Sequence, residues 1–294
     1  MSQLKSLRRF VAACRVTEGK GFTLKDHRTG DDGGLGLSKH TAGDALAQGV
    51  ERLAELQERL WATGRWSILC LFQAMDAAGK DGVIKHVFSG VNPQGCRVES
   101  FAAPSTRERG HDFLWRHSLE LPSRGRIGIH NRSWYEEVLV PRVHPELLHA
   151  SPIPPSLVTD RIWEERLEDI AAYERYLSRQ GTVILKFFLH LGQDEQRERL
   201  LARIDEPEKN WKFDPADLKE RGHWADYMAA YTHAIRATAA PHAPWFVIPA
   251  DRKWLTRLLV AEAIIEALEA LDLKAPAATE AQRDALQAAR AALA

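Results

Sequence analysis

The chain has 294 residues, of which 45% are hydrophobic and 27% charged, and 40 Lys plus Arg balance 40 Asp plus Glu. This composition supplies enough apolar material for a large core and excludes an intrinsically disordered protein. The zero formal net charge excludes a general binder of nucleic acids or membrane surfaces, so any anion-binding site must be local.

The first 40 residues are predicted to form an extension ahead of the main domain. Residues 1–16 are basic, but their apolar run at 10–14 is too short for a signal-peptide core, and we interpret them as a solvated arm. Residues 17–39, rich in Gly and Asp, are expected to have little regular structure. The chain has no run of roughly 18 apolar residues that would span a membrane, and its three cysteines lack metal or disulfide spacing. We therefore expect a cytoplasmic protein.

From residue 41 onward, helical and strand-like patterns alternate. A short continuous apolar run, typical of a strand buried on both faces of a parallel sheet, occurs at 67–72, and further strand candidates lie at 97–101, 126–130, 182–189 and 245–248. Apolar residues at helical spacing predict helices at about 41–62, 79–89, 105–117, 133–140, 160–179, 193–204, 214–238 and 255–268. This alternation predicts a three-layer α/β/α domain over 41–273 with a mostly parallel, five-stranded sheet, followed by a tail at 274–294.

A phosphate-binding motif follows the first predicted strand, where residues 73–82 read QAMDAAGKDG. A P-loop requires a strand, a tight turn whose amides face phosphate, a Lys, and a helix N-terminus aimed at the anion. Gly79 and Lys80 fit this template. Ala74 replaces the first Gly, at little cost where φ is negative, and Asp81 replaces the usual Ser or Thr. The alternative is an ordinary turn of small residues between strand and helix.

Charged residues near this motif are candidates for the chemistry. A carboxylate beside bound phosphates would repel them unless a divalent cation lies between, so Asp76 is a candidate metal ligand, the alternative being a turn or helix cap. Asn131 and Arg132 end the third strand, where a guanidinium is well placed to clamp phosphate, unless Arg132 forms only a surface ion pair.

The segment 199–227 is a candidate lid, because Pro207 interrupts a helical pattern and cations alternate with aromatic residues around it. Such a segment could close over a nucleotide, stacking on its base and holding its phosphates. The pattern is equally compatible with a hinge between two helices that pack on the core.

Four motifs together resemble the polyphosphate kinase 2 family. They are the P-loop run, GVNPQG at 90–95, NRSWYEE at 131–137 and DEPEKNWKF at 205–213, and the similarity extends in order from about residue 16 to residue 272. The resemblance implies a P-loop kinase fold similar to thymidylate kinase, inorganic polyphosphate along the P-loop, a nucleotide beneath the lid, and a homodimer or homotetramer.

By matching position, Asp76 resembles a metal ligand, and Lys80 and Arg132 resemble the phosphate-binding residues of the family. Many members carry Asp before that Arg, whereas Asn131 together with Glu136 resembles the subgroup that accepts both AMP and ADP.

The sequence thus predicts a polyphosphate-dependent kinase of AMP, ADP or both, with Mg²⁺ as cofactor and Mn²⁺ as an alternative. Asp76, Lys80 and Arg132 are the expected catalytic residues, and Glu136 and Glu137 are the further candidates for binding the metal. Substrate contacts are expected from the P-loop, the 131–136 segment and the lid, namely Ala77, Ala78, Gly79, Asp81, Gly82, Lys85, Asn131, Glu136, Arg199, Arg203, Lys209, Trp211 and Lys212. A nucleotide-donor nucleoside monophosphate kinase and a non-catalytic P-loop regulator remain alternatives.

Overall fold

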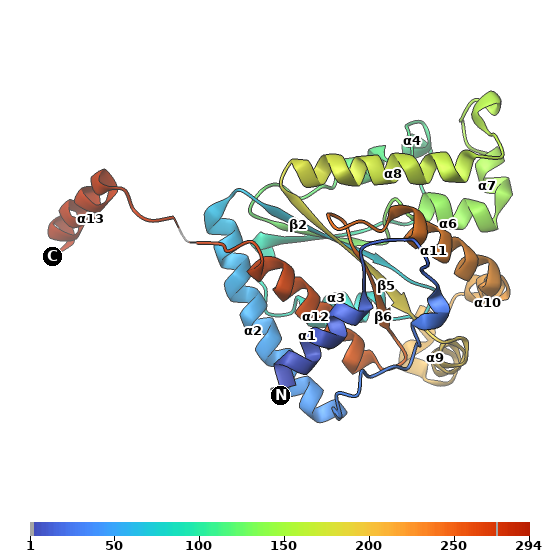
Figure 1. The fold of residues 1–294 in the computed structure, drawn as a ribbon, viewed down its shortest axis with the longest axis horizontal. Helices are drawn as coiled ribbons and strands as arrows, with labels where there is room; N and C mark the ends of the chain where they lie inside the picture. Colours follow the sequence, from blue (N-terminus) through green and yellow to red (C-terminus); the bar gives the residue numbers. More distant parts are fainter. Residues whose placement is uncertain (1–2, 275) are drawn as a thin grey trace.

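The structure, a computed structural model, describes residues 3–274 and 276–294 and is built around one six-stranded sheet (Figure 1). Its strands lie in the order β1-β6-β5-β2-β4-β3. Strands β2 to β6 are parallel, and β1 runs antiparallel to β6 at one edge. The strands are β1 Arg15–Val16, β2 Ser67–Gln73, β3 Cys96–Ser100, β4 Ile127–Asn131, β5 Thr182–His190 and β6 Trp245–Pro249.

The five predicted strands are therefore confirmed, but the predicted count of five is wrong by one. The additional strand, β1, is two residues long and shows no strand pattern of its own. It exists because Arg15 and Val16 pair with Phe246 and Trp245 of β6.

Helices cover both faces of the sheet, because successive strand side chains point to opposite sides. Ile68, Cys70 and Phe72 face one apolar cluster, and Leu69 and Leu71 face the other. The first cluster is covered by α1 Gln3–Cys14, α2 Lys39–Thr63, α3 Lys80–Val87 and α12 Lys253–Glu269. The second is covered by α6 Glu136–Val143, α8 Ile162–Arg179 and α11 Trp224–Thr238. The predicted three-layer α/β/α arrangement is confirmed.

Shorter elements connect these layers. They include the 3-10 turns η1 Leu24–Asp26, η2 Pro93–Gly95, η3 Pro155–Leu157 and η4 Pro207–Lys212, and the helices α4 Thr106–Arg109, α5 Trp115–Ser118, α7 Pro145–His149, α9 Gln193–Asp205 and α10 Pro215–Gly222. The last helix, α13 Glu280–Leu293, is exposed along its whole length and lies apart from the body of the molecule (Figure 1).

Three helix predictions need correction. The single helix expected at 105–117 is two short helices, since α4 ends at Arg109 and α5 begins only at Trp115. The helix expected at 214–238 is interrupted at His223, which caps both α10 and α11.

The third correction is at the N-terminus, where the segment expected to be a solvated arm contains α1. Leu7, Phe10, Val11 and Cys14 recur at helical spacing and are buried in the same cluster as α12. The basic residues occupy the outer face, and Arg8 forms an ion pair with Glu262. The predicted division into extension 1–40, domain 41–273 and tail 274–294 stays a prediction, and residues 1, 2 and 275 lie outside the described residues.

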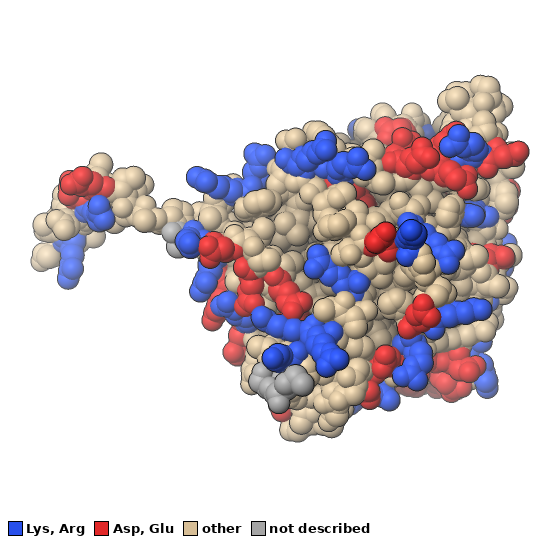
Figure 2. Space-filling view, viewed as in Figure 1, with Lys and Arg blue, Asp and Glu red and all other residues tan. Residues whose placement is uncertain are grey.

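The surface mixes both signs of charge, as Figure 2 shows for one face, where Lys and Arg are interspersed with Asp and Glu. All three cysteines are unpaired. Among the described residues, no helix is both long and apolar enough to cross a membrane.

Candidate active site

The P-loop is the turn of residues 74–79 between β2 and α3. Gly79 precedes α3 with a φ of 100°, a conformation that favours glycine. Ala77 has a φ of 61°, which is unfavourable for a residue with a Cβ. Ala74 is not among the residues with positive φ, so the substitution for the usual glycine costs little.

Lys80 lies at the centre of the loop as the first residue of α3. Its ammonium Nζ donates a hydrogen bond of 2.9 Å to the carbonyl oxygen of Ala74, so the loop wraps around the side chain. Burial lowers the pKa of Lys80, and the nearby carboxylate of Asp76 opposes that shift. The ammonium is therefore held in a half-buried site, where its charge acts more strongly on a bound anion than it would in open water.

Arg132 comes to the same place from β4, because the parallel register pairs Phe72 of β2 with Asn131 of β4. The Arg132 backbone N–H donates to the Phe72 carbonyl oxygen at 3.0 Å, and its φ is 67°. Its guanidinium Nη2 lies 3.7 Å from Oδ1 of Asp76, whose side chain is 29% exposed. Burial alone would lower the pKa of Arg132. The nearby carboxylates of Glu136 and Asp76 outweigh the effect of burial, so the pKa of Arg132 is raised.

A buried polar network fixes the segment between Arg132 and Glu136. Trp134 Nε1 and the Tyr135 hydroxyl donate to Oε1 of Glu174, at 3.2 and 2.8 Å. Lys186 Nζ donates to Oε2 of Glu174 at 2.6 Å, and both charged side chains are at most 1% exposed. Because each buried charge has its partner, the network can hold this strained segment without the penalty of an unpaired charge.

The two adjacent glutamates at the start of α6 point to different environments. Glu136 lies near Lys80 and Arg132; burial raises its pKa, and those two cations oppose the shift. Glu137 accepts a hydrogen bond of 2.9 Å from Nη2 of Arg116, whose side chain is 7% exposed. Glu136 therefore belongs with the P-loop residues, whereas Glu137 is already paired.

The residues present fit a divalent cation held jointly with substrate phosphates. No cluster of three or more His, Cys, Asp or Glu that could hold a metal occurs within residues 3–274 and 276–294. Mg²⁺ usually needs only one or two carboxylates, the remaining ligands being phosphate oxygens and water. Asp76 and Glu136 offer two carboxylates beside the P-loop, and they are better placed for this role than Glu137.

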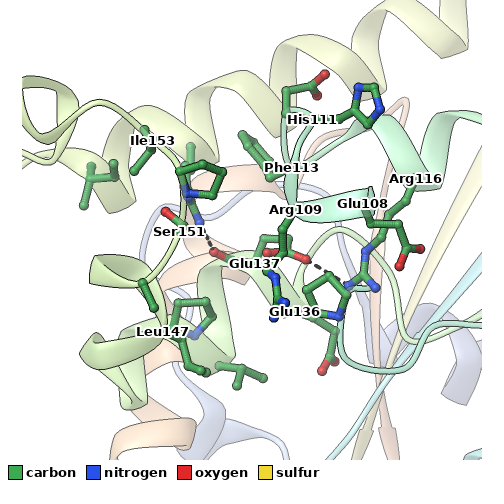
Figure 3. A pocket seen from close by; sticks show the side chains of 18 of the residues that line it. Glu108, Arg109, His111, Phe113, Arg116, Glu136, Glu137, Leu147, Ser151 and Ile153 are labelled. Carbon is green, nitrogen blue, oxygen red and sulfur yellow. Dashed lines mark hydrogen bonds and ion pairs between the residues drawn. The ribbon is translucent and has the colours of Figure 1, made fainter. Parts of the chain in front are cut away.

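A pocket of about 890 Å³ opens beside Arg132 and Glu136. In Figure 3, Leu147 and Ile153 lie on one side of it and Arg116 on the other, with Phe113 at the back. The walls come from residues 102–116, α6, residues 147–159 and the first half of α8. The pocket therefore combines apolar walls with charged groups, of which Arg132 and Glu136 are the ones beside the P-loop.

Most of the charged and aromatic side chains predicted for the lid contact one another or solvent and do not contact the P-loop. Arg203 forms an ion pair of 2.7 Å with Asp217, and Lys209 pairs with Glu206. Trp211 is 79% exposed, with the Lys212 ammonium 5.0 Å from its ring centre. These side chains have no contact with Lys80 or Arg132 among the interactions that the structure shows, and Lys85 is exposed on α3. Arg199 is different, because its side chain is buried against the P-loop backbone.

Other residues near the site were not singled out from the sequence. Asp217 of α10 forms the ion pair with Arg203, and burial together with Asp76 raises its pKa, while Arg203 opposes the shift. Lys253 and Arg257 belong to α12, and the Arg257 guanidinium lies near Gly82 of α3. Burial together with Arg199, Lys209 and Arg257 lowers the pKa of Lys253. Both α12 residues are more than 170 positions from the P-loop, and no motif marks them.

The strand, phosphate-binding turn and helix, with a Lys at the turn and an Arg on the neighbouring strand, define a P-loop phosphotransferase. The model of the family "Polyphosphate kinase 2 (PPK2)" matches residues 36–276. This chain belongs to that family.

Individual relatives agree with the family assignment. The chain is 52% identical to "ADP-polyphosphate phosphotransferase" of Rhodopseudomonas palustris, over 85% of this chain and 86% of the relative. It is 45% identical to "AMP/ADP-polyphosphate phosphotransferase" of Meiothermus ruber, over 89% and 94%. The crystal structure of polyphosphate kinase 2 from Arthrobacter aurescens superposes with a TM-score of 0.84 at 39% identity, covering 93% of this chain and 95% of that one.

Proposed function

We propose that this protein transfers phosphoryl groups from inorganic polyphosphate to both AMP and ADP, forming ADP and ATP, with Mg²⁺. The observation that carries the proposal is the convergence of Lys80, Arg132, Asp76 and Glu136 at the carboxyl edge of β2 and β4. Two cations suit the transferring phosphate, and two carboxylates suit a metal between donor and acceptor. The family and the named relatives supply the substrates.

The acceptor's nucleoside is assigned to the pocket beside Arg132 and Glu136. Its volume of about 890 Å³ is within the range of pockets that enclose small ligands. An acceptor phosphate directed out of this pocket would meet Arg132 first. The expectation that the nucleotide lies beneath the lid stays a prediction.

The donor chain is assigned to the other side of the P-loop. Along the carboxyl edge of the sheet, the pocket lies toward β3 and β4, whereas Lys253 and Arg257 follow β6. A cluster of cations matches a linear polyanion, whose charge continues beyond the transferring phosphate. With the donor on one side and the acceptor on the other, the transferring phosphoryl group would lie at Lys80.

The chemistry requires positioning and charge neutralisation more than proton transfer. The attacking group is a phosphate oxygen of AMP or ADP, which is already anionic near neutral pH, so no general base is needed. Lys80 and Arg132 bind the transferring group, and Asp76 and Glu136 would hold Mg²⁺, which neutralises phosphate charge. Closure of the lid would exclude water that could hydrolyse the donor.

Several further properties stay predictions. These are a homodimeric or homotetrameric assembly, a cytoplasmic location, the lack of a nucleic-acid or membrane partner, and Mn²⁺ as a substitute for Mg²⁺.

The test is to incubate the purified protein with Mg²⁺ and long-chain polyphosphate, adding AMP or ADP, and to measure ADP and ATP. We expect both products. Formation of ADP from AMP plus ATP, with none from AMP plus polyphosphate, would identify a nucleotide-donor kinase instead. Binding of nucleotide without turnover of any donor would identify a regulatory P-loop protein.

A further inference from the structure

Arg199 lies on α9 with its guanidinium buried between two loops. Nη1 donates to the carbonyl oxygens of Ala77 and Ala78, at 3.1 and 2.9 Å. Nη2 donates to the carbonyl oxygens of Ala250 and Asp251, at 2.6 and 3.1 Å.

The remaining donor, Nε, bonds to Glu195 at 2.7 Å. These five hydrogen bonds match the five N–H groups of a guanidinium, so none is left for a phosphate.

One helical turn earlier, Gln196 extends the same arrangement. Its Nε2 donates to the carbonyl oxygen of Asp76 at 3.0 Å, and the residue is 1% exposed. Side chains of α9 therefore hold three successive P-loop carbonyls, those of residues 76, 77 and 78. Because the C=O and N–H of a peptide unit point in opposite directions, holding the carbonyls on the α9 side directs the N–H groups of residues 77 and 79 toward the phosphate side. The N–H of Ala78 donates to the carbonyl oxygen of Met75 at 3.2 Å, which closes the turn.

Gln196 also contacts the lid. Its Oε1 accepts a hydrogen bond of 2.9 Å from Nη1 of Arg221 on α10, which also donates to the carbonyl oxygen of Gln193 at 2.7 Å. A continuous path of hydrogen bonds thus runs from α10 through Gln196 to the P-loop backbone at Asp76.

We propose that Arg199 and Gln196 are positioning residues that orient the P-loop amides, and that Arg221 links the lid to the P-loop through Gln196. Arg199 is then not the substrate ligand that its place in the lid motif predicts. The inference rests on the proposed phosphotransfer, and it assigns these residues to setting the geometry of the loop that binds the transferring phosphate.

Two substitutions at one position separate positioning from phosphate binding. Arg199→Lys keeps the charge, but a single ammonium cannot reach both loops, and Arg199→Met removes the charge. We expect both to lower kcat to a similar extent, about a hundredfold, as misplacement of a catalytic loop does. The KM for polyphosphate should change less than about twofold, and Arg197→Met, on the exposed face of the same helix, should change neither constant.

Amide hydrogen exchange gives a second readout that does not depend on activity. In the folded Arg199 variants, the amide of Ala78, which donates to the Met75 carbonyl oxygen, should exchange at least about tenfold faster, whereas the amides in the core strand β5 should not. Failure of the wild type to use polyphosphate would refute the proposed function while leaving this readout intact. The positioning role would be overturned if amide exchange were unchanged in the variants. It would also be overturned if the KM for polyphosphate were raised in Arg199→Met but normal in Arg199→Lys.

The link to the lid is tested with a double-mutant cycle of Gln196→Met and Arg221→Met. Arg221→Met should accelerate exchange of the Ala78 amide in the wild-type background and have no further effect in Gln196→Met, since its path runs through Gln196. Equal and additive effects in both backgrounds would show that the lid does not act through Gln196.

Discussion

Asn131 at the end of β4 donates a hydrogen bond from its side-chain Nδ2 to Oδ1 of Asp81 in the first turn of α3, at 2.6 Å. The bond joins the strand that carries Arg132 to the helix that carries Lys80. An aspartate at position 131 would place a second carboxylate against Asp81, and the two would repel unless a cation lay between them. Residue 131 therefore influences where a metal ion would be held.

The first prediction concerns acceptor choice. With a neutral amide at 131, the metal is free to shift and Glu136 can compensate when AMP, one phosphate shorter than ADP, is the acceptor. Asn131→Asp and Glu136→Ala should each lower kcat/KM for AMP relative to ADP, by about tenfold if one charge-assisted contact is lost. The measured quantity is the ratio of the two kcat/KM values, because it cancels any loss of active enzyme.

The control is the exchanged pair Asn131→Asp with Asp81→Asn, which retains an amide-to-carboxylate hydrogen bond. This double variant should recover activity with ADP. Its kcat/KM for AMP should stay low relative to its kcat/KM for ADP. A ratio that stays within about twofold of the wild type in both single variants would place acceptor choice elsewhere, such as in the lid.

The second prediction concerns Lys80, whose ammonium lies inside the P-loop turn. Lys80→Ala should fold and yet lose at least about a hundredfold in kcat, the usual effect of removing one well-placed electrostatic donor. Turnover is compared with that of Lys39→Ala, which removes an exposed lysine at the start of α2 and should behave as the wild type. Near-normal turnover in folded Lys80→Ala would contradict the P-loop assignment.

The third prediction is a pH dependence. Burial raises the pKa of Glu136, so protonation begins at a higher pH than for an ordinary glutamate. A protonated Glu136 cannot bind a metal, so kcat/KM for AMP should fall as the pH is lowered through this raised pKa.

A Glu136→Gln variant provides the comparison for the pH profile. It should have lower activity with AMP and should lack the part of the acid limb that comes from Glu136. Phosphate groups themselves titrate near about pH 6, and this contribution is common to both proteins. Superimposable profile shapes for the variant and the wild type would rule out Glu136 as the group that titrates.

The fourth prediction concerns lid movement. Trp211, 79% exposed in η4, should become less exposed when acceptor and donor bind together. Tryptophan fluorescence should shift in the wild type and shift much less in Trp211→Phe. Cleavage by trypsin after Lys209 and Lys212 should be slower in the liganded protein, and equal cleavage rates with and without ligand would indicate a static connection.

Local patterns in the sequence were sufficient for the parallel sheet and the P-loop. The strands at 67–72 and 182–189 are largely apolar, with Lys186 as an exception, because both of their faces are buried, and this pattern is visible in each segment alone. Gly79 and Lys80 likewise sit at the junction of a strand and a helix, which is a local feature. The helix at residues 3–14 was equally visible in the spacing of Leu7, Phe10, Val11 and Cys14, but its basic residues favoured a different interpretation.

Only the tertiary structure decided which groups meet. Strand β1 exists through its pairing with Trp245 and Phe246, and nothing within two residues predicts a partner so distant in the sequence. Lys253 comes to the P-loop because β6 and α12 bring it there. Arg199 resembles a phosphate ligand in its motif, yet its five donors are used by the backbone and Glu195. Hydrogen-bond partners are set by three-dimensional proximity, so residue type and spacing identified the charged residues but not what each one binds.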